Sequence, residues 1–120
     1  MKSAKKSMKT NNEKGLHAEL QAIDYLKSQN YTVLKHRFLS PYGEIDILAL
    51  KKHVLIAVEV KQRQYLEAAR TCIAPRQRQR IENALLYFVS QFPQYKEFSL
   101  RLDVVLMAEN QRVHIENAWI

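Results

Sequence analysis

The sequence is poor in cysteine, glycine, proline and long hydrophobic runs. Its 120 residues contain one cysteine, Cys72, so no disulfide can form within the chain, which favours a reducing compartment. The longest apolar run, Val54–Val58, is too short to cross a membrane, and no apolar segment of a signal peptide follows the basic N-terminus. These absences predict a single cytoplasmic domain with no membrane partner, long enough to build a hydrophobic core.

Positive charge, by contrast, is in excess. The net charge is +7, with a pI near 9.6. Part of it lies in residues 1–14, which lack hydrophobic periodicity and are expected to form a disordered basic tail ahead of a folded domain over residues 15–120. A basic balance favours a polyanion as partner, nucleic acid before anionic lipid, although charge alone also serves solubility.

Hydrophobic periodicity predicts two helices, over residues 15–29 and 76–92, the first with an apolar stripe of Leu16, Leu20, Ile23 and Leu26. Segments rich in β-branched and aromatic residues predict five strands, over residues 31–38, 44–50, 54–61, 100–108 and 112–120. The order α-β-β-β-α-β-β predicts an α/β fold in which helices flank a mixed central sheet.

Charged residues interrupt the apolar hairpin of this sheet: Glu44 and Asp46 in one strand, Glu59 and Lys61 in the other. An even-length link places Asp46 and Glu59 on one face of the sheet, and an odd-length link places them on opposite faces. We expect a four-residue link to set Asp46 opposite Glu59 and a two-residue link to set Glu44 there. Carboxylates this close repel one another, and Mg²⁺ prefers carboxylate and water ligands, so the pattern predicts a divalent-cation site.

The two helices add charge to the same region. Glu19 lies on the apolar stripe of the first helix, where it either forms a salt bridge with a lysine or arginine or joins the acidic cluster. Arg76, Arg78 and Arg80 crowd the start of the second helix, which predicts a phosphate site there or a solvated helix start. Arg101 and Asp103, two apart on one strand, are expected to form a structural ion pair.

These residues resemble a known pattern. Asp46, a gap of twelve residues, and then Glu59-Val60-Lys61 resembles the D…ExK core of the PD-(D/E)xK, or restriction-endonuclease-like, nuclease superfamily. Gly15-x-x-x-Glu19 is similar to the leading acid of its Holliday-junction resolvases. The strings "GEIDILAL", "VEVKQR", "RLDVV" and "HIENAW" look most like the YraN family of small uncharacterised bacterial proteins, over roughly residues 15 to 120.

The resemblance implies a restriction-endonuclease-like fold and a metal-dependent endonuclease that hydrolyses phosphodiester bonds in DNA, with branched DNA among the candidate substrates. It implies that Mg²⁺ or Mn²⁺ is held by Asp46, Glu59 and the Val60 carbonyl, with Glu19 binding through water or a second ion. Lys61 would orient the attacking water or stabilise developing charge. The residues expected to contact nucleic acid are Gln62, Arg63, Arg76, Arg78 and Arg80. Family members usually carry a lysine near Gln77, for which Arg76 and Arg78 are candidate substitutes.

Two other functions remain open at the level of the sequence. One is a module of nuclease fold that binds nucleic acid without cutting it. The other is a structural or assembly protein whose charged cluster is an ion-pair network. A homodimer is a further option that the sequence does not decide.

Overall fold

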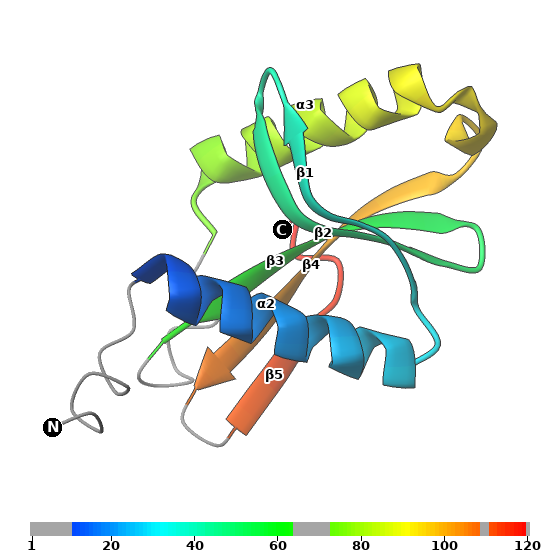
Figure 1. The fold of residues 1–120 in the computed structure, drawn as a ribbon. Coiled ribbons are helices and arrows are strands. Elements are labelled where there is room, and N and C mark those ends of the chain that lie inside the picture. The colour runs from blue at the N-terminus through cyan, green and yellow to red at the C-terminus, as the bar shows by residue number, and fades with distance from the viewer. Residues whose placement is uncertain (1–10, 64–72, 109–110, 120) are drawn as a thin grey trace, which may run out of the picture.

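The computed structural model describes residues 11–63, 73–108 and 111–119. The elements in chain order are α2 (Asn11–Ser28), β1 (Thr32–Ser40), β2 (Gly43–Lys51), β3 (Val54–Gln62), α3 (Pro75–Gln91), the 3₁₀ turn η2 (Pro93–Tyr95), β4 (Ser99–Ala108) and β5 (Gln111–Ile115). The strands form one sheet in the order β1-β2-β3-β4-β5, in which β3 and β4 run parallel and the other neighbours run antiparallel (Figure 1). The predicted α/β fold, with its element order and mixed sheet, is confirmed.

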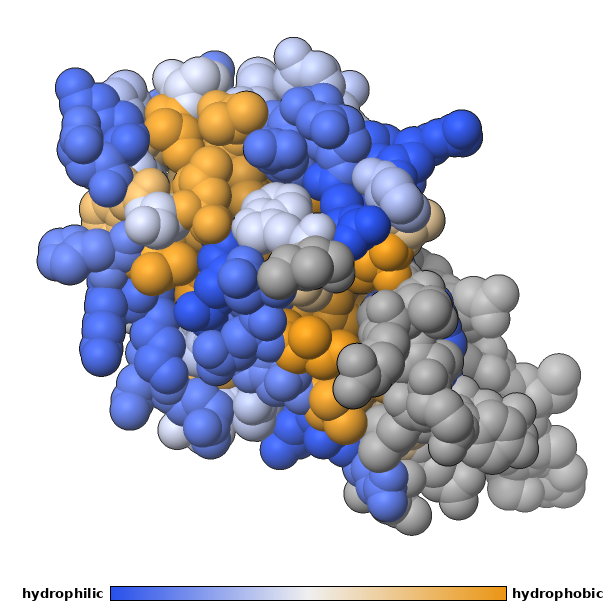
Figure 2. All heavy atoms as spheres, turned by 180° about the vertical axis from the view of Figure 1, so that it is seen from behind, coloured by the Kyte–Doolittle hydropathy of each residue, from blue (hydrophilic) through white to orange (hydrophobic). Residues whose placement is uncertain are grey.

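The two long helices cover opposite faces of the sheet (Figure 1). Successive residues of β3 point to alternate faces, so Ile56 and Val58 pack under α2 while Leu55 and Ala57 pack under α3. Burying a side chain of this size stabilises the fold by roughly 1.5–3 kcal/mol. Seen from behind, hydrophilic residues cover most of the surface and hydrophobic ones show as separate patches (Figure 2). Among the described residues, no helix is long and apolar enough to span a bilayer.

Helix α2 differs from the prediction at its start and on its buried face. It begins at Asn11, so residues 11–14, assigned to the tail, are helical, while residues 1–10 lie outside the described residues. Leu16 and Leu20 are 37% and 47% exposed, and the buried positions include Ala18 and Ala22. Alanines on the inner face let a helix approach the sheet closely, so the larger leucines lie outside the contact.

The β2–β3 hairpin has the register that the candidate site requires. Lys51 pairs with Val54, so the link is the two-residue turn Lys52–His53, and Ile47 pairs with Val58 further along. Extending this register sets Asp46 opposite Glu59. The expectation that a two-residue link would set Glu44 there is wrong, because this turn is centred on the same point as the four-residue link and therefore preserves its register.

Strand β5 ends at Ile115, five residues before the end of the predicted strand at Ile120. Asn117 adopts a positive φ of 56°, a conformation that Asn tolerates better than most residues, and the chain turns there. The Ala118 N–H then donates to the Leu102 carbonyl, and Trp119 packs against the α3-facing core. The last residues therefore cover the sheet instead of extending it.

Candidate functional site

Asp46 and Glu59 lie side by side where the β2–β3 ladder ends. The Val60 N–H donates to Oδ2 of Asp46 at 2.9 Å, and the Asp46 N–H lies 3.4 Å from Oε2 of Glu59. Each carboxylate thus accepts from the backbone of the opposite strand. Because the N–H and C=O of one strand residue point toward the same neighbour, the Val60 carbonyl is also directed toward β2. The Asp46 carboxylate and the Val60 carbonyl of the predicted metal site therefore lie on the β2 side of β3.

Burial and repulsion from neighbouring carboxylates make both carboxyl groups weaker acids than usual. Burial, followed by repulsion from Asp46, raises the pKa of Glu59 to about 8. Burial also raises the pKa of Asp46 to about 6, with a further contribution from Glu19, although the hydrogen bond from the Val60 N–H opposes the rise. The positive charge of Lys61 lowers both pKa values without cancelling the effect of burial. Both pKa values therefore lie closer to neutrality than those of ordinary carboxyl groups.

Two carboxylates and a backbone carbonyl are hard oxygen donors that suit Mg²⁺ or Mn²⁺, with water completing the coordination shell. Burial is the largest cause of both raised pKa values, and a cation at this position would favour the ionised form of both groups. Within the described ranges, however, no group of three or more His, Cys, Asp or Glu side chains is placed to hold a metal ion. The donor set fits the ion, but the expected third carboxylate is not part of it.

Glu19 is that third carboxylate, and it forms the salt bridge that was the alternative interpretation. Its Oε1 lies 2.7 Å from Nε2 of His36 and 2.8 Å from Nε of Arg37. The residue is 8% exposed, so these partners satisfy an almost fully buried charge. Glu19 still lies close enough to Asp46 and Glu59 for its charge to raise the pKa of both.

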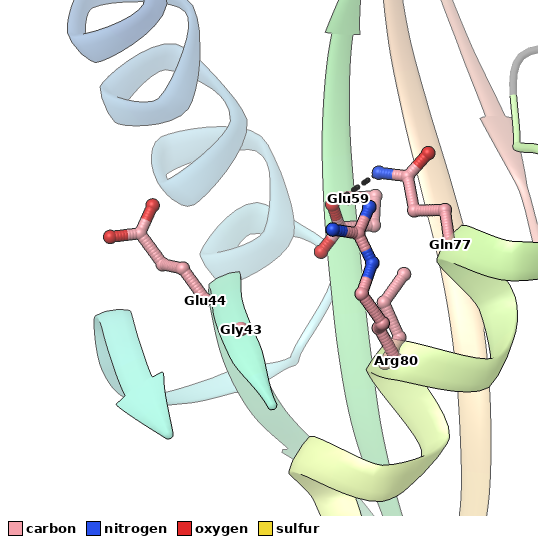
Figure 3. A pocket seen from close by; sticks show the side chains of 6 residues that line it. Gly43, Glu44, Glu59, Gln77 and Arg80 are labelled. Atoms are coloured by element: carbon pink, nitrogen blue, oxygen red, sulfur yellow. Dashed lines mark hydrogen bonds between the residues drawn. The ribbon is translucent and has the colours of Figure 1, made fainter. Parts of the chain in front are cut away.

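A shallow pocket opens beside Glu59, lined by Gly43, Glu44, Gln77, Arg80 and Ile81 (Figure 3). Gln77 on α3 points its amide at Glu59, with Nε2 at 3.4 Å from Oε1. The guanidinium of Arg80 also points toward Glu59, whereas Glu44 points away from it (Figure 3). Glu44 therefore lies outside the carboxylate pair. Sequence reasoning noted Gln77 only as a departure from the family; its contact with Glu59 depends on how α3 packs.

The residues predicted to contact nucleic acid differ in exposure and in the partners they already have. Arg76 and Arg80 are exposed at the start of α3. Arg78 instead donates from Nη1 to the Trp119 carbonyl at 2.9 Å, so it ties down the C-terminal segment. Gln62 and Arg63 are exposed at the end of β3, where Nη1 of Arg63 donates to the Gln62 carbonyl. Sequence spacing placed three arginines on one helix start, but it could not show that one of them is engaged by the far end of the chain.

A second charged cluster lies under α2, around Asp103. The predicted ion pair is present, with Asp103 oxygens 2.8 Å from Nε and 3.0 Å from Nη2 of Arg101. Tyr31 and His114 complete it, since the Tyr31 hydroxyl and His114 Nε2 both reach Oδ2. His114 lies eleven positions from its carboxylate partner and on another strand, so spacing along the sequence does not reveal this contact.

Comparison with known proteins places the chain in a family. The family model described as "Uncharacterised protein family UPF0102" matches residues 18–107. A UPF0102 protein of Rhodopseudomonas palustris is 42% identical over 94 residues, which cover 78% of this chain and 70% of the relative. A UPF0102 protein of Parvibaculum lavamentivorans is 36% identical over 106 residues, which cover 88% and 80%. The chain belongs to the UPF0102 family.

Proposed function

We propose that this protein is a metal-dependent endonuclease that hydrolyses phosphodiester bonds in DNA. The observation that carries the proposal is the Asp46–Glu59 pair, two adjacent carboxylates whose burial and repulsion raise both pKa values. A pair serving stability alone would be expected to face a neutralising partner, since unpaired buried charge is costly. Groups with perturbed pKa values beside a pocket are functional candidates for the same reason.

Asp46 and Glu59, with the Val60 carbonyl, would hold Mg²⁺ or Mn²⁺. When bound, such an ion polarises a phosphoryl oxygen and makes its water more acidic. The chain supplies the remaining charge. Lys61 shares the face of Glu59, two residues along β3, and its positive charge acts on both carboxylates. Its ammonium is therefore placed to orient the attacking water or to stabilise the negative charge that develops at the phosphate.

Basic and amide side chains flank this pair and suit the DNA backbone. Arg80 and Gln77 reach the pocket from α3, and Arg76 is exposed one turn before Arg80. Arg63 is exposed just beyond the end of β3. Contacts of this kind bind phosphate whatever the base sequence, so the proposal favours recognition of DNA shape, with branched DNA among the substrates, over recognition of a base sequence.

A second candidate is a nucleic-acid-binding module that does not cleave. It is favoured by the engagement of Glu19, whose Oε1 is already held by His36 and Arg37. If the reaction needs a third carboxylate at the metal, the contacts of Glu19 oppose it. Both candidates share the phosphate-binding surface, and only catalysis separates them.

The test is cleavage of labelled branched and linear DNA in Mn²⁺ by the wild type, Lys61→Ala and a matched control. Lys27→Ala is that control, because Lys27 is exposed in the last turn of α2 and has no part in the site. We expect Lys61→Ala to lose roughly 10²–10³-fold in rate, as when one stabiliser of transition-state charge is removed, and Lys27→Ala to match the wild type.

Binding of the same DNA in Ca²⁺ should survive Lys61→Ala within a few-fold. Equal cleavage by the wild type and Lys61→Ala would point to a contaminating nuclease and overturn the enzymatic proposal. A wild type that binds DNA but cleaves none of the substrates would favour the non-catalytic module.

A further inference from the structure

Arg37 has an unusual backbone conformation in the middle of a strand. Its φ is +58°, in the left-handed region that side chains other than glycine rarely adopt. Among the described residues, the other non-glycine positions with positive φ are Asn30, Lys52 and Asn117, and all three lie outside the strands. A conformation that costs free energy persists where the surrounding structure enforces it, and such residues cluster at functional sites.

This conformation brings the Arg37 guanidinium to the acidic end of the hairpin. In the β1–β2 register His36 pairs with Ile47 and Phe38 with Ile45, so Arg37 comes level with Asp46. Its Nε donates to Oε1 of Glu19 at 2.8 Å. That hydrogen bond and the attraction of Glu19 raise the pKa of Arg37, and the charges of Glu44 and Asp46 act in the same direction. Arg37 therefore lies within the field of carboxylates from α2 and β2.

The contacts of Arg37 leave most of its hydrogen-bonding capacity unused. Only Nε has a hydrogen-bond partner among the described residues, and the side chain is 31% exposed. A guanidinium carries five N–H donors in a fixed planar fork, so Nη1 and Nη2 still offer four. With Nε held by Glu19, the orientation of the fork is set before any ligand arrives. His36 holds the same Glu19 oxygen at 2.7 Å and so steadies the acceptor.

We propose that Arg37 binds a backbone phosphate of the nucleic acid next to the Asp46–Glu59 pair, using Nη1 and Nη2, while Glu19 acts as the positioning residue that orients it. The assignment rests on the proposed function, since it names a phosphate contact of the same site. It also gives the buried Glu19 a role that needs no place at the metal. The negative charge of the carboxylate pair repels an approaching phosphate, and a preoriented arginine beside the pair offsets that repulsion.

The alternative is that Arg37 serves only to neutralise Glu19 within the fold. Substitution to glycine separates the two roles, because glycine adopts a positive φ without strain and removes the guanidinium cleanly. Lys52→Gly is the matched control. Lys52 also has a positive φ, of 57°, and is exposed in the β2–β3 turn, so its replacement removes one positive charge and relieves one strained residue outside the site.

The experiment measures binding of labelled branched DNA in Ca²⁺ by fluorescence anisotropy over a range of salt concentrations. We expect Arg37→Gly to weaken binding about tenfold, as for one charge-assisted contact. The slope of log affinity against log salt should become shallower by about 0.9 on duplex DNA or about 0.7 on a single strand. Lys52→Gly should stay within about twofold of the wild type, with the slope unchanged.

A purely structural role would lower the melting temperature of Arg37→Gly and leave its salt slope at the wild-type value, which would overturn the assignment. If Arg37→Gly does not fold, Arg37→Lys replaces it. A lysine lacks the planar fork in which Nε holds Glu19 while Nη1 and Nη2 face a phosphate, so we expect several-fold weaker binding, and wild-type affinity in folded Arg37→Lys would contradict the proposal.

Cleavage in Mn²⁺ separates this proposal from the proposed function. We expect ethylguanidinium in solution to restore part of the cleavage lost in Arg37→Gly, a rescue that a structural role does not predict. A wild type that cleaves, with Arg37→Gly equal to Lys52→Gly in binding and rate, overturns the role of Arg37 and leaves the nuclease intact. A wild type that neither binds nor cleaves DNA overturns both.

Discussion

The buried carboxylate of Asp103 and the buried Asp46–Glu59 pair have opposite surroundings and opposite changes in pKa. Asp103 is fully buried and has five hydrogen bonds, two of them to Arg101 and one to His114. Burial alone would raise its pKa, but the hydrogen bonds from His114 and Arg101 lower it below the ordinary value. Glu59 is 4% exposed, its hydrogen bonds to the Asp46 N–H and to Gln77 are both 3.4 Å long, and its pKa is raised.

The difference separates a carboxylate neutralised by its own chain from a pair that the proposed function assigns to a metal ion. Around Asp103 the chain supplies a guanidinium, a hydroxyl, an imidazole and a backbone N–H, so the carboxylate is satisfied without any other molecule. Around Glu59 it supplies two hydrogen bonds of 3.4 Å from neutral donors, and Asp46 accepts one of 2.9 Å from the Val60 N–H. Neither carboxylate has a hydrogen bond from a charged group among the described residues. In the proposed function, a divalent cation would neutralise that pair.

The largest change in stability is expected on replacement of Asp103, whose charge is neutralised by Arg101. Asp103→Asn leaves the Arg101 guanidinium without its buried partner, and breaking a buried pair in this way costs about 3–5 kcal/mol. We expect the free energy of unfolding, measured in urea, to fall by that amount. Glu116→Gln is the control, because Glu116 is 58% exposed and lies 3.8 Å from Arg101. Its loss should cost under about 0.5 kcal/mol, and an equal loss in both variants would contradict the comparison.

Replacement of Glu59 is expected to raise stability instead of lowering it. Its pKa is about 8 in the folded chain against an ordinary 4.5, so the folded state holds more protons than the unfolded state between these values. Stability without metal should therefore fall as pH rises from about 4.5 to about 8. Glu59→Gln removes this dependence and should be more stable than the wild type at pH 8 in EDTA. Asp46→Asn should likewise melt higher in EDTA and gain nothing from Mg²⁺.

Thermal melts across this pH range provide the measurement, with Glu82→Gln on the exposed face of α3 as the control. Glu82→Gln should keep the pH dependence of the wild type. If Glu59→Gln were destabilised at pH 8 in EDTA, the pair would belong to a stabilising ion-pair network, and its distinction from the Asp103 cluster would disappear.

The sequence predicted the elements and the carboxylate pair because both depend on local periodicity. Alternation along the two strands predicted that Asp46 and Glu59 share a face only if the link has an even length, and the two-residue turn between Lys51 and Val54 meets that condition. The partners of Glu19 could not be predicted in this way. They depend on the left-handed conformation of Arg37, for which no glycine marks the position, and on the packing of α2 over β1.

The exposure of Leu16 and Leu20 was missed for a related reason. Periodicity ranks residues by hydrophobicity, whereas the closeness of a helix to its sheet is set by small residues such as Ala18 and Ala22. The contact between Arg78 and the Trp119 carbonyl joins segments far apart in the chain. Spacing within one helix carries no information about such a contact.

The smallest effects are expected for the arginines of α3, where replacement should affect DNA binding at Arg76 and stability at Arg78. Arg76→Ala should weaken DNA binding a few-fold and reduce the salt slope by about 0.9 on duplex DNA, because Arg76 is exposed. Arg78→Ala should lose about 1 kcal/mol of stability with its hydrogen bond to Trp119, and its salt slope should not change. Anisotropy titrations and urea unfolding of both variants check this, and a reduced slope in Arg78→Ala would show that Arg78 meets the backbone.

The most direct test of the central claim is calorimetric titration of the protein with Mn²⁺ at pH 7, in two buffers with different heats of ionisation. If Asp46 and Glu59 form an uncompensated pair that shares a proton, one ion should bind and a proton should be released. Glu59→Gln and Asp46→Asn should lose the binding, and Lys61→Ala should retain it. Absence of Mn²⁺ binding in the wild type, or equal binding in Glu59→Gln, would contradict the account.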